Sequence, residues 1–234
     1  MLLCIVIHMY KGLGMSVAVA RPRVVRPDNS IGKIGCATRK TKGNLKCIVL
    51  DLDETLINTR SGKAERLVVQ KALRERGETD RYYEFKLGNQ IYWGVKRAYY
   101  AYFLAWAFST FDIVGVWTAA EFDYATAVID ATFPEQPHFI WSRDDCVKSS
   151  GLFYKPLSKL FSRFPQLDID NTIIVDDRSD IAQYNPSMLV EVPAFNYKNP
   201  LTYDRTLIVL LTKIRDWLNG DETLRATNKT DIEW

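Results

Sequence analysis

Residues 45–55, which read LKCIVLDLDET, form an apolar run that ends abruptly in acids. The run is rich in β-branched residues and lacks the spacing of an amphipathic helix, so it predicts a short strand buried on both faces. Buried strands of this kind belong to parallel sheets that helices cover on both sides. We therefore expect the folded body to start at Leu45 and to place acidic side chains directly after its first strand.

Strands and helices alternate along the rest of the body. We predict further buried strands in FDIVGVWTAA (111–120), HFIWS (138–142) and TIIVDD (172–177), and helices over 63–76, 97–110, 121–132 and 204–218. Gly77 is a plausible helix stop and Asp204 a possible N-cap. Two aromatic runs that flank Gly88-Asn89 predict a β-hairpin over 82–97. This alternation implies an α/β fold, a Rossmann-like parallel sheet with right-handed crossovers, flanked by helices.

The composition excludes several classes of protein. The chain has 234 residues, of which 47% are hydrophobic and 25% charged, the balance of a globular domain rather than of a disordered chain, a collagen or a polytopic membrane protein. Its 4 cysteines include no C-x-x-C pair, which argues against a zinc ribbon or a dense disulfide scaffold and points to a reducing compartment. With only 2 histidines, a multi-histidine metal site is excluded.

The charge is distributed unevenly along the chain. Residues 1–46 hold nine Lys or Arg and one Asp, whereas the remainder carries 22 bases against 27 acids. We expect a basic, flexible N-terminal arm over 1–44, a body over 45–220 and a polar C-terminal tail over 221–234. The basic charge of the arm could also attract acidic partners or nucleic acid.

An apolar run opens residues 1–20. It is about half as long as the roughly 20 residues of a spanning helix, and it lacks the basic start of a signal peptide. We therefore find no firm membrane signal and do not expect this segment to act as an anchor. An intracellular protein, cytoplasmic or nuclear, is the expectation.

Four acids follow two of the predicted strands. Asp51 and Asp53 end the first strand, and Asp176 and Asp177 end the strand over 172–177. Ligands of such sheets bind beyond the carboxyl ends of the strands, where these carboxylates can converge. A site made only of oxygen atoms with several carboxylates suits Mg²⁺. Without a cation the crowded acids would raise one another's pKa, so the pattern argues for a bound metal or for partial protonation.

Two further residues could complete a phosphate site. Thr118 ends the second predicted strand, and Lys155 lies between the third and the fourth. A hydroxyl and an ammonium group can bind the oxygens of a transferring phosphoryl group and offset its charge. Taken singly, Thr118 could be a structural strand-end threonine and Lys155 a surface lysine.

These motifs, taken in order, resemble a known family. The segments IVLDLDETL, VWTAAEFDYA, SRDDC, YKPLS and IIVDDRSD, with Asn185-Pro186 after them, look like the haloacid dehalogenase superfamily. More narrowly, they resemble its small CTD phosphatase branch, also called the NLI-interacting-factor-like phosphatases. The likeness runs from about Leu45 to Trp217. It implies a haloacid dehalogenase-like fold in which the predicted hairpin forms a flap beside the active site.

The resemblance also implies a mechanism and a role for each matching residue. Asp51 would be the nucleophile that forms an aspartyl-phosphate, and Asp53 the general acid and then the base. Thr118 and Lys155 would bind the phosphoryl oxygens. Mg²⁺ would bind Asp51, the backbone carbonyl of Asp53 and Asp177, with Asp176 close by.

The implied substrate is phosphoserine or phosphothreonine in a protein segment, with the C-terminal tail of RNA polymerase II as one such phosphoprotein. The hairpin aromatics would lie in the substrate cleft, where flat rings suit extended Pro-containing peptides; alternatively, half of them only pack the hairpin. These aromatics are Tyr82, Tyr83, Phe85, Tyr92 and Trp93. Arg143 matches a family arginine near the cleft, and it could bind a phosphate or acidic flank, or only pair with Asp144 or Asp145.

Two other functions remain open on the same scaffold. One is a phosphatase for small molecules or nucleic-acid ends, which the basic arm would favour. The other is a catalytically silent binding module, against which the intact set of reacting groups argues.

Overall fold

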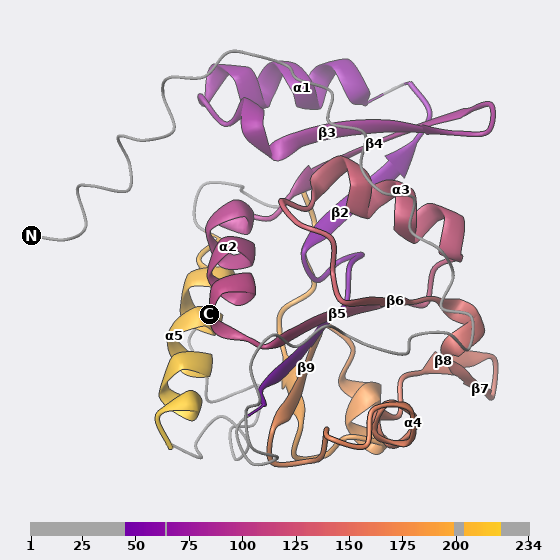
Figure 1. The fold of residues 1–234 in the computed structure, drawn as a ribbon. Coiled ribbons are helices and arrows are strands. Elements are labelled where there is room, and N and C mark those ends of the chain that lie inside the picture. Colours follow the sequence, from indigo (N-terminus) through magenta and orange to yellow (C-terminus); the bar gives the residue numbers. More distant parts are fainter. Residues whose placement is uncertain (1–44, 64, 199–203, 221–234) are drawn as a thin grey trace, which may run out of the picture. The chain divides into compact units, whose positions relative to one another are not determined.

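The computed structural model describes residues 45–63, 65–198 and 204–220. Its main feature is a five-stranded sheet in the order β10-β9-β1-β5-β6 (Figure 1). All the pairings in it are parallel. The strands are β1 (Cys47–Leu50), β5 (Ile113–Trp117), β6 (Phe139–Trp141), β9 (Thr172–Asp176) and β10 (Leu189–Glu191). All four residues of β1 are buried, which confirms the strand predicted from the opening run.

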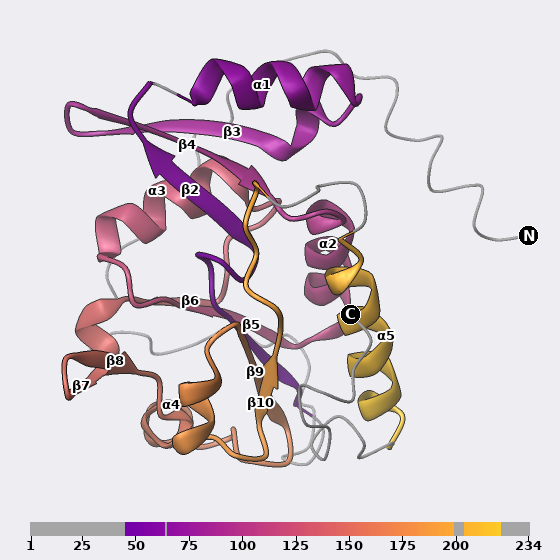
Figure 2. The same cartoon turned by 180° about the vertical axis from the view of Figure 1, so that it is seen from behind.

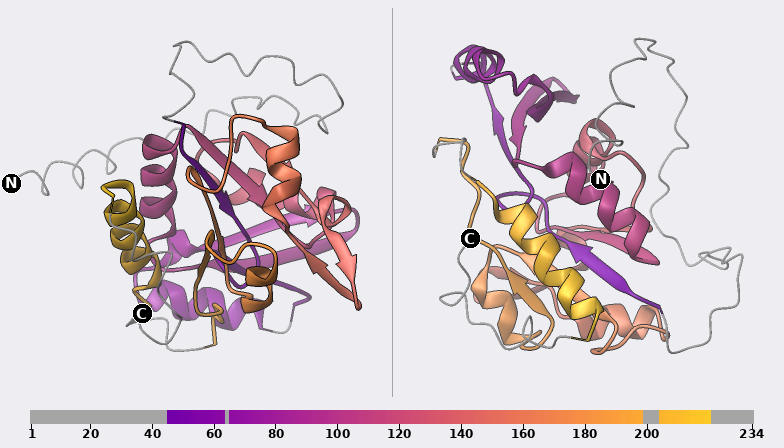
Figure 3. Two further views of the ribbon diagram at one scale, coloured as in Figure 1. Left: turned by 90° about the horizontal axis from the view of Figure 1, so that it is seen from below. Right: turned by 90° about the vertical axis from the view of Figure 1, so that its left-hand side faces the viewer.

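Helices cover both faces of this sheet. On one face α2 (Tyr100–Thr110) packs beside α5 (Thr206–Leu218), and α3 (Phe122–Thr132) joins them through a bond from the Tyr100 hydroxyl to Thr132 Oγ1 at 3.0 Å. The orange helix α4 (Leu157–Arg163) lies on the other side of the sheet from α2 and α5 (Figure 3). The α/β class, with its parallel sheet flanked by helices, is confirmed.

The strand order creates a switch point beside β1. From β1 the chain crosses to β5 and then β6, whereas β9 and β10 lie on the opposite side of β1 (Figure 2). Connections that leave β1 and β9 therefore diverge, and the carboxyl ends of strands at such a point are where ligands of parallel sheets bind. The predicted acids stand at these two ends.

A second sheet is built around the predicted hairpin. Strands β3 (Tyr82–Leu87) and β4 (Gln90–Lys96) are joined by Gly88-Asn89, as expected, with Gly88 at a positive φ of 58°. Strand β2 (Ile57–Ser61) pairs with the other edge of β4, so the sheet has three antiparallel strands. β2 was not predicted, because its sequence INTRS holds a single apolar residue. The hairpin is thus anchored by the chain that leaves the first strand.

The helix boundaries shift by a few residues from those predicted. The helix predicted over 63–76 is α1 (Arg66–Glu75), and α2 starts three residues late, after Tyr99 in a left-handed conformation with φ of 63°. Arg205, and not Asp204, takes the N-cap position of α5; Asp204 lies one residue before it, and its Oδ1 accepts a bond from the Thr206 N–H at 3.0 Å.

Short elements complete the described chain, and the sequence patterns did not predict them. They are the hairpin β7 (Val147–Ser149) and β8 (Leu152–Tyr154) and the 3₁₀ turns η1 (Thr79–Arg81), η2 (Arg143–Asp145) and η3 (Ser179–Gln183). With three to five residues each, they are too short to show a periodicity. The seven-residue helix α4 and the three-residue strand β10 were missed as well.

The core packs tightly around the central strands. One buried cluster joins Val49 of β1 and Ile174 of β9 to Leu160 of α4. Gly115 is needed within this cluster, because a Cβ atom there would lie 2.0 Å from the ring of Phe139. A second cluster lies under α1 and gathers Leu73, Trp93, Val95, Phe195 and Tyr197.

Some predictions fall outside the described residues. The arm over 1–44, with its apolar run over 1–20, and the tail over 221–234 both lie there. Within the described part of the chain, no helix has the length and apolar character needed to cross a membrane.

Candidate active site

Two carboxylates meet at the tips of β1 and β9. The strands are parallel in a register that pairs Leu50 with Val175, so the next residues, Asp51 and Asp176, lie level. The Asp51 N–H donates to the Val175 carbonyl at 3.0 Å, which extends the ladder to this acid. Asp51 is 6% exposed and Asp176 is fully buried. Charged groups at this depth need partners.

Lys155 is the partner of both acids. Its Nζ donates to Asp51 Oδ1 at 2.5 Å and to Asp176 Oδ2 at 2.7 Å, and the residue is only 1% exposed. It is therefore a buried cation rather than a surface lysine. Asn185 holds the backbone around it, since Nδ2 donates to the Lys155 carbonyl and Oδ1 accepts from the Leu157 N–H, each at 2.8 Å.

Asp177 joins the group through Thr55. The Thr55 hydroxyl lies 2.9 Å from both Asp51 Oδ2 and Asp177 Oδ1, and it accepts from the Asp177 N–H at 3.1 Å. A hydroxyl has one hydrogen, so it can donate to only one of the two carboxylates at a time. The other carboxylate oxygen then receives no hydrogen from Thr55.

The three carboxylates are suitably placed for a divalent cation. Asp51, Asp176 and Asp177 each offer an oxygen, and these atoms lie within 4.8 Å of one another. Three carboxylates beside one ammonium leave a surplus of negative charge in a buried site. An ion such as Mg²⁺ would neutralise this surplus with the oxygen ligands that it prefers, so the donor set fits the metal. The side chain of Asp53 is not among these three.

The pKa values in the cluster reflect burial. Desolvation raises the pKa of Asp51, although the Lys155 ammonium opposes the change. Burial likewise raises the pKa of Asp176 to about 6 and moves that of Asp177 upward. Burial also opposes the charge of Lys155, but the Asp176 and Asp51 carboxylates outweigh it and raise its pKa. The ammonium is therefore firmly charged at neutral pH.

Asp53 points toward the second sheet. Its Oδ1 accepts a bond from the Tyr124 hydroxyl at 2.6 Å and one from Thr59 Oγ1 at 3.2 Å. The Thr59 hydroxyl also lies 2.7 Å from that of Tyr83. Burial raises the pKa of Asp53, and the bonds from Tyr124 and Thr59 lower it in part. A carboxyl with a raised pKa suits proton transfer near neutral pH.

Thr118 stands at the same edge of the sheet, one residue beyond β5. Parallel pairing of β5 with β1 brings it beside the tip that carries Asp51. It is buried, and its Oγ1 accepts from the Ala120 N–H at 3.1 Å. That bond uses a lone pair, so the hydroxyl hydrogen is not engaged by it.

Arg143 is the first residue of η2. Its Nε donates to the Ala119 carbonyl at 2.9 Å, and its Nη1 lies 3.4 Å from Glu121 Oε1. The guanidinium also covers the ring of Phe153 at 5.4 Å. Arg143 therefore forms its ion pair with Glu121, whereas one alternative expected a pair with Asp144 or Asp145. The side chain is 43% exposed, which leaves it accessible to a ligand.

Tyr92 and Trp93 lie on opposite faces of β4. Tyr92 stacks on Phe85 at 5.3 Å between ring centroids and meets the edge of Tyr124 at 5.8 Å, on the side of Asp53. Trp93 is 1% exposed and donates to the Gly62 carbonyl at 2.9 Å, under α1. The prediction that Trp93 lies in the substrate cleft is therefore wrong. Successive side chains of a strand point to opposite faces, so Trp93 cannot line the face on which Tyr92 lies.

Four residues beside these groups had no role in the sequence prediction. Thr55 and Tyr124 both stand inside quoted motifs, so their position next to the acids was a usable signal. Asn185 was itself among the quoted residues, together with Pro186. Thr59 carried no signal, because its strand β2 could not be recognised.

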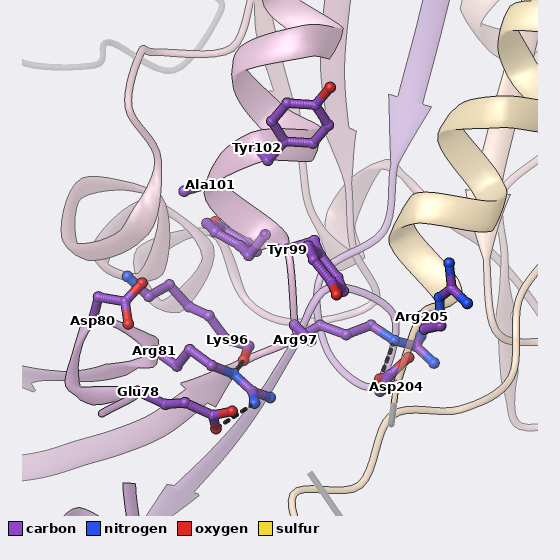
Figure 4. A pocket seen from close by; sticks show the side chains of 12 residues that line it. Glu78, Asp80, Arg81, Lys96, Arg97, Tyr99, Ala101, Tyr102, Asp204 and Arg205 are labelled. Carbon is purple, nitrogen blue, oxygen red and sulfur yellow. Dashed lines mark hydrogen bonds and ion pairs between the residues drawn. The ribbon is translucent and has the colours of Figure 1, made fainter. Parts of the chain in front are cut away.

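A separate cavity of about 430 Å³ lies around the start of α2 (Figure 4). Its charges are largely paired: Arg97 with Asp204 at 2.8 Å and Arg81 with Glu78 at 2.9 Å. The residues that line it include none of the acids at the strand tips. Lys155 and the clustered carboxylates thus lie outside this cavity.

Comparison with known proteins matches the body of the chain. A family model described as NLI interacting factor-like phosphatase matches residues 46–225. The putative CTD phosphatase-like protein 355R of Invertebrate iridescent virus 3 is 27% identical over 180 residues, which is 72% of this chain and 94% of the viral protein.

Solved structures with a similar fold were also found. One is Fcp1, an essential RNA polymerase II CTD phosphatase, with a TM-score of 0.49 and 22% identity; the match covers 79% of this chain and about half, 51%, of that one. Another is a predicted phosphoglycolate phosphatase from Haemophilus somnus 129pt, with a TM-score of 0.44 and 14% identity over 74% of this chain and 99% of that one.

Proposed function

This chain belongs to the NLI interacting factor-like phosphatase family, and on that basis we propose that it is a Mg²⁺-dependent phosphatase for phosphoserine or phosphothreonine in protein segments. One observation carries the proposal. The Asp51 carboxylate stands at the tip of the central strand, 2.5 Å from a buried ammonium, with two further carboxylates within reach of a shared cation. This is the arrangement that an aspartate needs to attack a phosphate dianion.

In the first step, Asp51 attacks phosphorus in line with the ester bond. We assign Oδ1 as the attacking atom, because it faces Lys155, whereas Oδ2 faces Thr55 and Asp177. The bond from phosphorus to the ester oxygen breaks while Asp53 gives its proton to that oxygen. The products are the free hydroxyl of the substrate and an aspartyl-phosphate on Asp51. A placed proton donor typically accelerates such a step by about 10²–10⁴-fold.

In the second step, water attacks the aspartyl-phosphate. Asp53, now ionised, takes a proton from the water as the new bond to phosphorus forms. The bond between phosphorus and Asp51 breaks, phosphate leaves, and both acids return to their starting states. Lys155 and Thr118 would hold the phosphoryl oxygens through both steps and offset the charge that develops on them.

Asp51, Asp177 and the backbone carbonyl of Asp53 would hold the metal, with Asp176 close by. When bound, Mg²⁺ supplies positive charge that lowers the repulsion between the incoming phosphate and the three carboxylates. Without the metal, the Lys155 ammonium neutralises only one of the three negative charges.

The proposed substrate class follows from the family and from the surface around Asp53. Tyr92 and Phe85 present stacked rings beside this acid, and flat rings suit extended Pro-containing peptides. The C-terminal tail of RNA polymerase II is one such phosphorylated segment. The viral relative, named as CTD phosphatase-like, agrees with this choice.

The test is release of phosphate from matched substrates with and without Mg²⁺. We expect phosphoserine peptides to exceed nucleotides, phosphorylated nucleic-acid ends and sugar phosphates in kcat/KM, and chelation to abolish turnover. A preference for the small molecules or nucleic-acid ends would instead establish the second phosphatase function. Protein that binds peptides without hydrolysing any substrate would be the silent module.

Covalent chemistry is tested separately with beryllium fluoride, which mimics a phosphoryl group on aspartate. Wild type should take up one equivalent in the presence of Mg²⁺, and Asp51→Asn none. Turnover should also disappear in Asp51→Asn and in Asp53→Asn, while the circular dichroism spectrum of each variant shows that the fold is retained. Near wild-type activity of Asp51→Asn would contradict the covalent mechanism.

A further inference from the structure

The hydrogen bonds on Asp53 converge on one of its two oxygens. Oδ1 accepts from Tyr124 at 2.6 Å and from Thr59 at 3.2 Å. Because Thr59 has a single hydrogen, donating it to Asp53 leaves Thr59 an acceptor for the Tyr83 hydroxyl, 2.7 Å away. The result is a directed chain of donors that ends on Oδ1.

This direction of bonding decides where Asp53 can carry a proton. Oδ1 is surrounded by donor hydrogens, and a protonated carboxyl has only one O–H group. A proton on Oδ1 would face the hydrogens of Tyr124 and Thr59, so the proton of the acid belongs on Oδ2. The same bonds restrict rotation of the carboxyl group, which keeps Oδ2 in one orientation.

The ring of Tyr124 is itself held by the second sheet. It meets the edges of Phe85 and Tyr92 at 5.9 and 5.8 Å between centroids, and those two rings stack on each other at 5.3 Å. Tyr124 comes from α3, whereas Phe85 and Tyr92 come from β3 and β4. The position of its hydroxyl therefore depends on the packing of α3 against the second sheet.

We propose that Tyr124 is a positioning residue for the acid: its hydroxyl, assisted by Thr59, keeps Asp53 Oδ1 as an acceptor, so that Oδ2 carries the proton for the leaving oxygen. This inference rests on the proposed function and assigns a role that the family membership does not supply. Proton transfer to the leaving oxygen matters most for weakly acidic leaving groups and little for strongly acidic ones. Loss of the Tyr124 hydroxyl should therefore be selective for the leaving group.

The experiment uses a series of aryl phosphates whose phenols differ in acidity. For each, kcat/KM is measured with Mg²⁺ for wild type and Tyr124→Phe, and its logarithm is plotted against the pKa of the phenol. We expect a shallow slope for wild type and a steeper one for Tyr124→Phe. The least acidic phenol should lose roughly tenfold, the equivalent of one hydrogen bond to a charged group. The most acidic phenol should lose under about twofold.

Two further variants keep the result interpretable. Thr59→Val removes the second donor to Oδ1 and should also steepen the slope. This variant tests the inference even if Tyr124→Phe folds poorly. Tyr100→Phe is the matched control, because it deletes a tyrosine hydroxyl whose bond, to Thr132 at 3.0 Å, involves none of Asp53, Thr59 and Tyr124. It should leave both slope and rates unchanged.

The outcomes separate this inference from the proposed function. An equal loss across the whole series in Tyr124→Phe would overturn the positioning role while leaving phosphatase activity established. An unchanged slope in both Tyr124→Phe and Thr59→Val would overturn it as well. Wild type without activity on any aryl phosphate would overturn the proposed function, and this inference with it.

Discussion

Lys155 and its two carboxylates show how much of the site rests on single residues. The ammonium reaches Asp51 across 104 positions of sequence and is almost fully buried. Removing one partner of a buried ion pair leaves an uncompensated charge, which typically costs about 3–5 kcal/mol. The arrangement therefore serves the fold of the site as well as its chemistry. Lys155 bonds to Asp51 and Asp176, whereas the side-chain partner of Asp177 is the neutral hydroxyl of Thr55.

The raised pKa of Asp176 leads to a prediction about pH and metal. Its folded-state pKa of about 6 exceeds the ordinary 3.8, so the stability that its protonation contributes to the metal-free protein is lost as pH rises through about 6. Below that pH the proton competes with the cation, and metal binding weakens by up to about tenfold per pH unit. We expect the rise in melting temperature caused by Mg²⁺ to be small at pH 5 and to grow by pH 7.5.

Differential scanning calorimetry at the two pH values, with Mg²⁺ and with chelator, measures this effect. Asp177→Asn is the control, since it removes one of the three clustered carboxylates and should abolish the shift at both pH values. A larger shift at pH 5 than at pH 7.5 would contradict a metal site made of these acids.

At the scale of elements, the strands determine which side chains can meet. On β4, Tyr92 lies on the side of Asp53 and Trp93 lies under α1, because side chains alternate between the two faces of a strand. One strand thus supplies both a wall beside the acid and an anchor in a separate core. A shift of register by one residue would exchange these roles and bury Tyr92 in place of Trp93.

The close approach of β5 and β6 gives a prediction at this scale. Gly115→Ala would place a Cβ atom 2.0 Å from the ring of Phe139. The two residues are paired between β5 and β6, so the ring cannot move away unless the strands shift apart. We expect a loss of about 1–3 kcal/mol or more in the free energy of unfolding, measured by urea denaturation. Adding Phe139→Leu should recover part of the loss, because it shortens the neighbour. Stability of Gly115→Ala within about 0.5 kcal/mol of wild type would show that the strands can separate.

At the scale of the whole molecule, the strand order concentrates the chemistry in one place. The crossovers from β1 and from β9 diverge, and the acids of both strands stand together at the carboxyl ends between them. The second sheet then brings its aromatic face to Asp53 through α3. The acids, Lys155, Tyr124 and Thr59 all come from the body that starts at Leu45.

Truncation tests whether this body is sufficient. We expect removal of residues 1–44 to leave kcat/KM on a small aryl phosphate and the melting temperature unchanged, because the residues assigned to the site lie beyond residue 44. Activity on a phosphopeptide, measured in parallel, would report any contribution of the basic arm to substrate binding. Failure of the truncated chain to fold would show that the arm is part of the core.

Local patterns in the chain were sufficient for the strands β1, β5, β6 and β9, for the main helices and for the hairpin turn at Gly88-Asn89. They also placed Asp51 and Asp176 at strand ends, since an apolar run followed by acids is visible without any knowledge of the neighbours. Such features depend on backbone conformation and on periodicity over a few residues. The order of the motifs added the expectation of a phosphatase, which the family match supports.

Which side chains touch was decided only by the folded molecule. Burial of Lys155 between Asp51 and Asp176, the turn of Asp53 toward Tyr124, and the exclusion of Trp93 from the cleft all join or separate residues across the order and register of the strands. Those depend on crossovers and packing between distant segments. Periodicity places a residue on a face of its own strand or helix, but the residue that lies opposite belongs to another part of the chain.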